Sequence, residues 1–557
     1  MLKEELENLL FIDNKPFESN GISKELLSAY DEFILSNDNS DKCISSEVFN
    51  IYKKFVSMKQ EAPAGMKNEL FEVMKNYVRE KVSGKEYLDA LFMLRFLMMK
   101  SKLQAGSYYE IAEILSKMND NTLAMEFIDL YDKFETNKPL KLLSLGNFYN
   151  LQLKDYRHAI KFYEQYLKID ETKSVIYTIL AGLYAKEYGE FSLKDQVYYF
   201  EKAYRLKPED RLILHGLAFG YEKLGDINNA RKFYQKLLEN NPTNTDYYNY
   251  GAFLISCGEL QEGHKFLTHR FNIDDKNLQY PVSTSKGVKW DLKSDISDKT
   301  LLVHYEQGFG DTFMYCRFVP GLKPLAKKVI FVVQNELFEL IKSSEIFEGI
   351  DIVSSKLNLD ELEFDVHMSL LDAPFVCGVD SCNLPYTDKY LNVDEILVQE
   401  YAKKYLVSSG CLKVGISYQG NKSANYNGRD IDFSRFSRLF NLKNIDFYSF
   451  SLDAESDERV ISLGKTFENF TYTACALKNM DIVISSDNVI LNLAGALGVK
   501  TYGLFNKNPN FRWFKLTGDN IGWYESVTPL QAEENNCWSD VFSELVEILN
   551  KNSKNNF

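Results

Sequence analysis

A pattern of small and aromatic residues recurs at a nearly constant spacing in the segment 140–271, and it constrains the fold more than any other feature of the chain. The copy that ends at Pro242 is the most complete. In it, Ala218 and Ala230 are small enough to let two helices approach closely, while Tyr234 fills the space beside them. Pro242 cannot continue a helix and is expected to follow the end of the second one. Each copy therefore predicts one hairpin of two helices.

Neighbouring copies repeat this spacing, which resembles that of the tetratricopeptide repeat. One spans about 180–208 with a turn lengthened at 187–191, another lies at 145–166, and a degenerate one spans about 248–270. Stacked hairpins form a solenoid whose concave surface can hold an extended peptide or a partner protein; oligomerisation or simple support is the alternative. Residues 1–139 are also helical in pattern and are interpreted as degenerate repeats or as a cap of the solenoid.

After residue 272 the pattern changes to alternating strands and helices. We expect a linker at 272–299, a first lobe at 300–395, and a second lobe at 396–557 that ends in a helix. The apolar runs that predict buried parallel strands are 300–305, 328–333, 351–353, 364–368, 412–418, 445–450, 480–485 and 500–505. The predicted fold class is thus α + α/β: a helical solenoid followed by two Rossmann-like lobes. Ligands of such lobes bind at the carboxyl ends of the strands.

The first candidate site is the turn 306–311 (EQGFGD), which follows the first predicted strand. Gly308 and Gly310 let the backbone approach a ligand closely, with Gln307 beside them. A helix is expected to begin near Asp311. This carboxylate can either remove a proton from a reacting hydroxyl or cap the helix, and the sequence leaves both roles open.

The second candidate site is the helix start in 485–495, where Asp487 or Asn488 can cap the helix. Free backbone N–H groups and the helix dipole at such a start, which includes Val489 and Asn492, can accept a diphosphate. A purely structural cap beneath a packed turn is the alternative.

A third group follows the first strand of the second lobe. Arg429 is a candidate for neutralising a leaving diphosphate, since a guanidinium keeps its charge and presents several donors; a surface salt bridge is the alternative. Lys422 lies nearby and can substitute for it. The other residues that we expect beside a nucleotide are Tyr418, Gln419, Asn421 and Phe450.

Composition excludes several other classes of protein. The formal net charge is −14 and no concentrated Lys/Arg surface stands out, which argues against nucleic-acid binding. No stretch approaches the roughly 20 apolar residues of a membrane span, and the acidic start does not resemble a signal peptide. The cysteines are scattered without paired spacing, so we expect free thiols in the cytoplasm. No His/Asp/Glu cluster has the spacing of metal ligands, so no metal is expected.

An ordered set of motifs resembles proteins that fuse tetratricopeptide repeats to a glycosyltransferase region. That region is similar to bacterial heptosyltransferases and, more distantly, to O-linked N-acetylglucosamine transferase. The motifs are 289–292 (KWDL), 301–311, 317–320 (RFVP), 418–421 with Arg429, 486–488 (SDN), 492–498 (NLAGALG) and 512–513 (RW). The resemblance covers roughly 140–535. It implies a GT-B pair of lobes, a nucleotide-sugar donor, inverting and metal-independent transfer to a hydroxyl, and Asp311 as the base.

The chain departs from this family at two positions. Asn492 stands where many relatives carry a histidine, and Ser451 where they often carry a glutamine; no histidine follows His367. An asparagine can bind a phosphate or ribose but cannot carry positive charge or transfer a proton at neutral pH. Three hypotheses follow: a transferase acting on a protein held by the repeats, a non-catalytic scaffold or ligand sensor, and a transferase acting on a saccharide or lipid.

Overall fold

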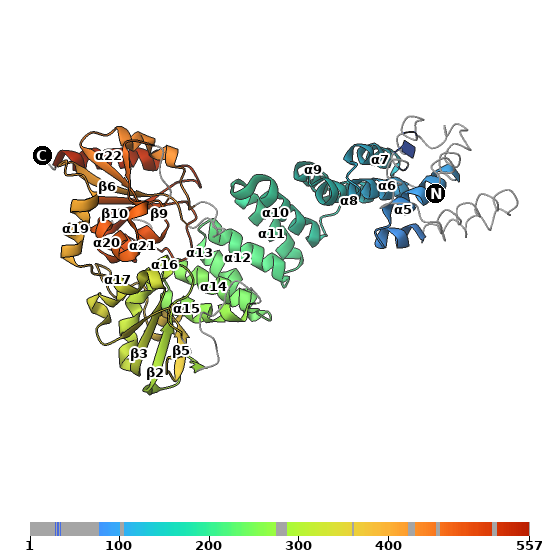
Figure 1. Cartoon of the computed structure of the whole chain (residues 1–557). Helices are drawn as coiled ribbons and strands as arrows, with labels where there is room; N and C mark the ends of the chain where they lie inside the picture. Colours follow the sequence, from blue (N-terminus) through green and yellow to red (C-terminus); the bar gives the residue numbers. More distant parts are fainter. Residues whose placement is uncertain are drawn as a thin grey trace, which may run out of the picture. The chain divides into compact units, whose positions relative to one another are not determined.

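The structure is a computed structural model, and it divides into two compact units, Met1–Gly225 and Asp226–Phe557 (Figure 1). It describes residues 77–100, 105–273, 287–358, 361–420, 429–452, 457–514 and 521–555, together with a few positions between 28 and 34. The division falls inside the predicted repeat region, so the last repeats belong to the same unit as the lobes.

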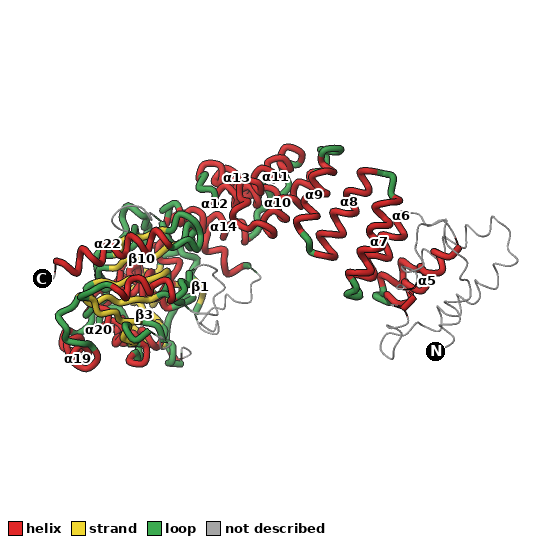
Figure 2. The backbone as a smooth tube through the Cα atoms, turned by 90° about the horizontal axis from the view of Figure 1, so that it is seen from above, coloured by secondary structure: helices red, strands yellow, loops and turns green. Residues whose placement is uncertain are grey.

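The described part of the first unit is helical, as Figure 2 shows in red. Its helices include α5 (Tyr87–Lys100), α6 (Ala105–Lys117), α7 (Asn121–Phe134), α8 (Lys138–Phe148), α9 (Tyr156–Leu167), α10 (Ser174–Tyr188), α11 (Leu193–Leu206) and α12 (Arg211–Lys223). Successive helices pack in pairs, such as α8 with α9 and α10 with α11. Asparagine or aspartate side chains cap several starts, including Asp155 and Asp210, because their oxygens accept the free N–H groups of the first turn. The part of 1–139 that the structure describes is therefore helical.

Glycines allow close approaches both within a hairpin, between α8 and α9, and between neighbouring hairpins, between α11 and α12. A Cβ atom on Gly146 would lie 2.8 Å from the ring of Tyr163, and one on Gly216 would lie 2.4 Å from the ring of Phe200. The lengthened turn forms a short 3-10 turn, Gly189–Ser192, between α10 and α11. These contacts confirm the predicted hairpins.

The second unit begins with the helices α13 (Ile227–Glu239), α14 (Asn244–Ser256) and α15 (Leu260–Leu267), and then the 3-10 turn η3 (Thr268–Asn272). Helices α14 and α15 cross where each has a glycine, because a Cβ atom on Gly251 would lie 2.7 Å from the Gly263 carbonyl oxygen. Ile255, Leu260 and Leu267 from this hairpin share one apolar core with residues of both lobes. The last hairpin is therefore packed as part of the C-terminal region.

The first lobe is a parallel sheet with the strand order β1-β5-β2-β3-β4. Its strands are β1 (Val288–Lys289), β2 (Ile296–His304), β3 (Ala326–Val333), β4 (Asp351–Ser354) and β5 (Val366–Ser369). Its helices include α16 (Phe309–Tyr315), α17 (Phe338–Lys342) and α18 (Ala373–Val376). The strand β1 and the start of β2 lie inside the segment 272–299, which was predicted to be a linker. That prediction is wrong for these residues, because an exposed two-residue edge strand leaves no apolar run to detect.

The second lobe is a parallel sheet with the strand order β11-β10-β9-β6-β7-β8. Its strands are β6 (Leu412–Ser417), β7 (Ile445–Ser449), β8 (Val460–Ser462), β9 (Ile482–Ser486), β10 (Thr501–Phe505) and β11 (Val527–Gln531). Its helices are α19 (Glu395–Tyr405), α20 (Phe470–Lys478), α21 (Val489–Ala496) and the C-terminal α22 (Ser539–Asn555). The predicted fold class, a helical solenoid followed by two Rossmann-like lobes, is confirmed.

Candidate functional site

The turn after β2 brings Asp311 to the carboxyl end of the first sheet. Helix α16 begins at Phe309, two residues earlier than predicted, and Asp311 Oδ2 accepts a hydrogen bond from the Gly308 N–H at 3.2 Å. Gln307 has a φ of 65°, and its carbonyl accepts a bond from Gln334 Nε2 at 3.4 Å. The turn is thus fixed by its own backbone and by the end of β3.

The turn after β9 forms the matching start in the second lobe. Asn488 caps α21, since its Oδ1 accepts the Ile490 N–H at 2.8 Å. Its Nδ2 donates to the hydroxyls of Ser417 at 3.0 Å and Ser486 at 3.1 Å. Of the two predicted caps, Asn488 therefore fills the position, which leaves the side chain of the preceding Asp487 available for other contacts.

The two helix starts face each other within the second unit, and Figure 1 shows α16 beside α21. A Cβ atom on Gly310 would lie 3.2 Å from Asn492 Nδ2 and 3.7 Å from the Cα atom of Val489. Gly310 therefore lies in close contact with α21 where the two lobes meet. The arrangement directs the amino ends of α16 and α21 toward one place.

Acidic and basic side chains of both lobes gather at these helix starts. Arg512, in the loop after β10, forms an ion pair with Asp311 through Nε and Oδ1 at 2.7 Å, and it donates a hydrogen bond to the Gln307 side chain. Arg429 interacts electrostatically with both Asp311 and Asp487. The structure thus brings together three of the candidate residues, Asp311, Asp487 and Arg429, and adds Arg512.

Burial has the largest effect on the pKa of the Asp311 and Asp487 carboxyl groups. It raises the pKa of Asp311 above its ordinary value, although Arg512 and the Gly308 N–H oppose the rise. Burial also raises the pKa of Asp487, against the opposing charge of Arg429 and a hydrogen bond with Trp513. A carboxylate whose pKa lies closer to neutrality is a better proton acceptor, so Asp311 suits a general base.

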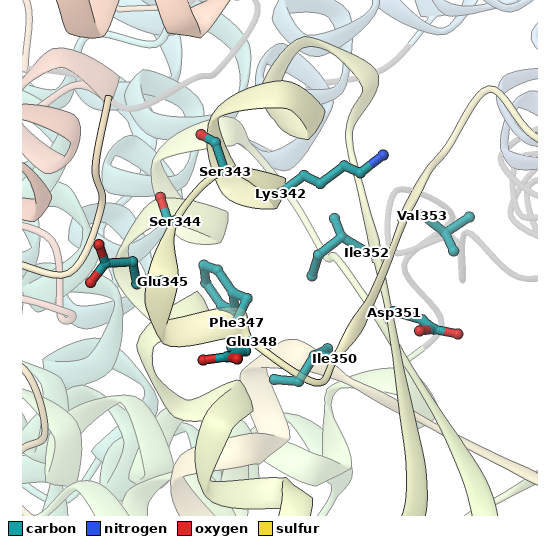
Figure 3. A pocket seen from close by; sticks show the side chains of 10 residues that line it. All are labelled: Lys342, Ser343, Ser344, Glu345, Phe347, Glu348, Ile350, Asp351, Ile352 and Val353. Carbon is teal, nitrogen blue, oxygen red and sulfur yellow. The ribbon is translucent and has the colours of Figure 1, made fainter. Parts of the chain in front are cut away.

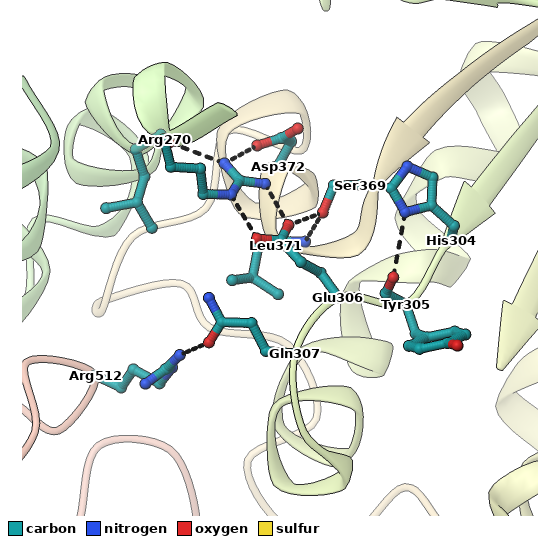
Figure 4. A network of polar contacts seen from close by, with 10 residues as sticks. Arg270, His304, Tyr305, Glu306, Gln307, Ser369, Leu371, Asp372 and Arg512 are labelled. Atoms are coloured by element: carbon teal, nitrogen blue, oxygen red, sulfur yellow. Dashed lines mark hydrogen bonds and ion pairs between the residues drawn. The ribbon is translucent and has the colours of Figure 1, made fainter. Parts of the chain in front are cut away.

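Behind this turn lies a buried ion cluster that sequence reasoning did not predict (Figure 4). Arg270 of η3 donates through Nε and Nη2 to the two carboxylate oxygens of Glu306, at 2.8 and 2.6 Å. Its Nη1 donates to Asp372 at 2.7 Å and to the Leu267 carbonyl at 2.9 Å. The Ser369 hydroxyl also donates to Glu306. All four polar side chains of this cluster are buried.

The remaining predicted residues lie in several places. Asn492 is buried, accepts a hydrogen bond from the Tyr524 hydroxyl at 2.9 Å and donates to the Asn488 carbonyl at 3.3 Å. Phe450 and Tyr418 are also buried, and their rings pack against Phe467 and against Phe433 and Phe436 respectively. Gln419 is exposed beside Gly420, where a Cβ atom would lie 3.9 Å from the Cβ atom of Asn488. Asn421 and Lys422 lie outside the described residues.

Phe450 and Tyr418 therefore contribute their rings to the core, and the charged cluster does not include them. A hollow of about 580 Å³ in the first lobe, between α17 and β4, also lies apart from the charged cluster (Figure 3). Lys342, Phe347 and Asp351 are among its lining residues, and none of the predicted site residues lines it. A second hollow of about 770 Å³ lies between the α14–α15 turn and the two lobes, with Cys257, Cys382 and Phe514 in its lining.

Two further features of the described residues concern membranes and metals. Among the helices described, none is long and apolar enough to cross a membrane. The part of the chain that the structure describes has no group of three His, Cys, Asp or Glu residues arranged to hold a metal ion.

Sequence reasoning missed Arg512, Glu306 and Arg270 as members of the site. Arg512 and Glu306 lie inside motifs of the family resemblance, but the sequence alone assigns no role to either residue. Arg270 closes the degenerate last repeat. No local pattern predicts these pairings, because the Arg512–Gln307 bond joins residues 205 positions apart and the Arg270–Asp372 bond joins residues 102 positions apart.

Comparison with known proteins gives matches for both halves of the chain. The family model of the tetratricopeptide repeat matches residues 142–173 and 213–244. Protein FlbA of Caulobacter vibrioides is 20% identical over 391 residues, which cover 63% of this chain and 63% of that protein. The chain therefore spans less than two thirds of that relative.

Several solved structures are also similar to parts of the chain. MamA from Desulfovibrio magneticus RS-1 is 20% identical, with a TM-score of 0.26, and covers 30% of this chain and 93% of its own. A glycosyl transferase of family 9 from Veillonella parvula is 11% identical, with a TM-score of 0.32, over 46% of this chain and 91% of its own. ADP-heptose LPS heptosyltransferase II from E. coli is 12% identical, with a TM-score of 0.34, over 45% of this chain and 99% of its own.

The matched repeats lie on hairpins that the structure describes, and the sheets that follow them form two parallel α/β lobes. The chain thus joins tetratricopeptide repeats to a pair of Rossmann-like lobes.

Proposed function

We propose that the C-terminal region is a glycosyltransferase that moves a sugar from a nucleotide-sugar donor to a hydroxyl group. The observation that carries the proposal is the meeting of Asp311, Asp487, Arg429 and Arg512 at two helix starts that face each other, each at the carboxyl end of a parallel sheet. A diphosphate is anionic and fits two guanidinium groups beside the amino end of α21. The same place holds the half-buried carboxylate of Asp311, whose raised pKa suits a base.

The proposed reaction is a single displacement that inverts the anomeric carbon. The acceptor oxygen forms a bond to that carbon while its proton passes to Asp311. The bond between the carbon and the donor's diphosphate breaks, and the nucleoside diphosphate leaves with the electron pair. Arg429, Arg512 and the amides at the start of α21 stabilise its charge, so we propose that the reaction needs no divalent metal. We also propose that it takes place in the cytoplasm.

We propose a protein acceptor because apolar residues recur on the surface of the repeats. Each lies six positions before a small residue of the hairpin pattern, and each is exposed. They are Leu140 (48% exposed), Val175 (55%) and Leu212 (63%), which precede Gly146, Ala181 and Ala218 respectively. Such a row favours contact with an extended peptide, because a solenoid presents equivalent positions at regular intervals.

The experiment has two stages. Nucleoside diphosphates and nucleotide sugars are first screened for their effect on Tm, and each binder is then assayed for donor hydrolysis and transfer. Asp311→Asn is expected to bind the donor normally but to lower kcat by about 10²- to 10⁴-fold. The matched control is Asp351→Asn, because Asp351 is exposed in an ion pair with Lys328 and is expected to leave kcat unchanged. If no nucleotide or nucleotide sugar raises Tm, the proposed function is wrong.

A second candidate function is a ligand sensor or scaffold without catalysis. It is favoured by the Asp311–Arg512 ion pair and by the two intramolecular hydrogen bonds of Asn492, which occupy groups that a reaction would use. A nucleotide sugar that binds without turnover, equally well to wild type and to Asp311→Asn, would support this candidate. Turnover that disappears in Asp311→Asn would exclude it.

A further inference from the structure

The buried ion cluster joins the last repeat hairpin to the turn that carries Asp311. Arg270 comes from η3, at the end of the repeats, and Glu306 stands one residue before Gln307. Burial of a guanidinium with two carboxylates is costly, and apolar residues of similar volume often join two elements at lower cost. Two parallel hydrogen bonds between a guanidinium and a carboxylate, however, fix the distance and orientation of the two elements more strictly than apolar packing does.

The turn itself has a conformation that needs such support. Gln307 has a φ of 65°, in the left-handed region that residues other than glycine rarely adopt. On one side of Gln307, Arg270 holds Glu306; on the other, Arg512 donates to the Gln307 side chain. A backbone held in this way positions the start of α16, and Asp311 with it.

We infer that Arg270 is a positioning residue for Asp311: by holding Glu306, it sets the turn from which the proposed base is presented. The inference rests on the proposed glycosyltransferase function. It means that the repeat region supplies part of the support of the reacting group as well as a surface for the acceptor.

The charges around the turn give this inference a specific signature. Asp311 faces Arg512, Arg429, Asp487 and the Gly308 N–H, and the charge of Glu306 contributes to raising its pKa. Removing that charge is therefore expected to lower the pKa of Asp311. Because the base must be deprotonated, the acid limb of kcat/KM against pH should then move to lower pH.

The groups around Glu306 define the control. Arg270, the Ser369 hydroxyl and His304 face Glu306, while Arg270 itself also faces Asp372, Lys289 and the buried His264. Burial keeps His264 neutral by lowering its pKa to about 3, so it adds no charge near neutral pH. Asp372 shares Arg270 with Glu306, but it follows β5 and does not belong to the turn.

The experiment compares two isosteric variants that each remove one carboxylate from the same arginine. Glu306→Gln is expected to lower kcat by about 10- to 100-fold with the donor KM unchanged, because a small displacement of the base slows the reaction without weakening donor binding. Its acid limb should move to lower pH. Asp372→Asn should keep kcat within about twofold of wild type and leave the acid limb in place.

Amide hydrogen exchange of the turn provides a readout that does not depend on turnover. Exchange of 306–311 is expected to accelerate in Glu306→Gln and to stay at the wild-type rate in Asp372→Asn. If Glu306→Gln does not fold, Ser369→Ala tests the same contact without removing a charge: kcat should fall while the acid limb stays in place.

Two results separate this inference from the proposed function. If the wild-type protein turns over but Glu306→Gln and Asp372→Asn behave alike, Arg270 is only a structural joint and the inference is overturned. If the wild type turns over no donor but exchange of 306–311 responds to Glu306→Gln alone, the turn is positioned by Arg270 and the proposed function is the part that fails.

Discussion

Arg317 shows how a single side chain can join the two lobes. It is fully buried, donates to the Trp523 carbonyl at 2.7 Å and to the Tyr390 hydroxyl at 2.9 Å, and lies over the rings of Tyr390 and Tyr524. The described contacts satisfy its charge with carbonyl dipoles and aromatic faces. Replacing it would leave several buried acceptors without donors.

We therefore predict that Arg317→Met lowers the free energy of unfolding by about 3 kcal/mol, since buried acceptors and a cation–π contact are lost together. Chemical denaturation measures the change. Arg459→Met is the control, because Arg459 is exposed and solvent screens its ion pair with Asp457, so the loss should be much smaller. Equal losses in the two variants would contradict the role assigned to Arg317.

The two raised carboxyl pKa values also predict how stability depends on pH. Burial raises the pKa of Asp487 above its unfolded value. Its ionisation therefore lowers the stability of the folded state as the pH rises from the unfolded pKa, and the loss is complete above the folded pKa. Asp487→Asn removes that charge and should raise Tm at pH 7 by about 2 °C. The difference from wild type should shrink as the pH falls toward the unfolded value.

Asp457 supplies a control of opposite sign. Arg459 and its backbone N–H lower the pKa of Asp457 to about 2. Its contribution to stability is therefore present above the unfolded pKa and is lost as the pH falls through the folded one. Asp457→Asn should lower Tm at pH 7, so a rise in both variants would show that the sign is not set by burial.

At the scale of elements, the crossing of α14 and α15 depends on glycine. A Cβ atom on Gly251 would lie 2.7 Å from the Gly263 carbonyl oxygen and 3.0 Å from the Leu267 nitrogen, and both neighbours are backbone atoms that move only with the whole helix. Gly182 in α10 has no atom within 4 Å of such a Cβ position. Replacing these two glycines with alanine is therefore expected to have opposite effects on stability.

We expect Gly251→Ala to destabilise the second unit by about 2 kcal/mol, because the helices must move apart. Gly182→Ala should stabilise the first unit by about 0.5–1 kcal/mol, because alanine has the higher helix propensity. Hydrogen exchange measured separately in the two units checks both. If Gly251→Ala left the free energy of unfolding of the second unit unchanged, the two helices would be able to move apart without loss of stability.

The strands show how much of the fold could be predicted from the sequence. The eight apolar runs all correspond to strands, because a buried parallel strand requires a continuous apolar segment. The three strands that were missed are edge strands: β1 is exposed, β8 has three residues, and β11 contains Pro529. An edge strand is paired on one side only, so it tolerates polar residues and proline and can lack a distinctive pattern. The edge strand β4 was predicted because it keeps a short apolar run.

Some residues of the candidate site could also be proposed from the sequence, and others could not. Asp311, Asp487 and Arg429 could be proposed from sequence because each follows a recognisable strand, and the carboxyl ends of parallel strands are where ligands bind. Phe450 satisfies the same rule, yet its side chain turns into the core, because sequence position does not determine the direction of a side chain at a strand end. Arg512 and Arg270 belong to a loop and a repeat, and only the fold brings them to the turn.

At the scale of the whole molecule, the chain contains two compact units that should respond differently to a ligand. We predict that a nucleoside diphosphate slows amide exchange in the second unit, around α21 and the loop that carries Arg512, because binding stabilises the state that holds the ligand. Exchange in α8 to α12 should not change. Equal protection of both units would place the nucleotide elsewhere.

The core that α14 and α15 share with the lobes limits how this chain can be recombined with others. A chimera that exchanges the repeats at residue 271 would cut between Arg270 and its carboxylates and would pair a foreign hairpin with an apolar surface shaped for this one. An exchange at residue 225 leaves that core intact. For the proposed transferase, we therefore predict that new acceptor specificities are gained by replacing repeats that precede residue 226, whether in nature or in the laboratory.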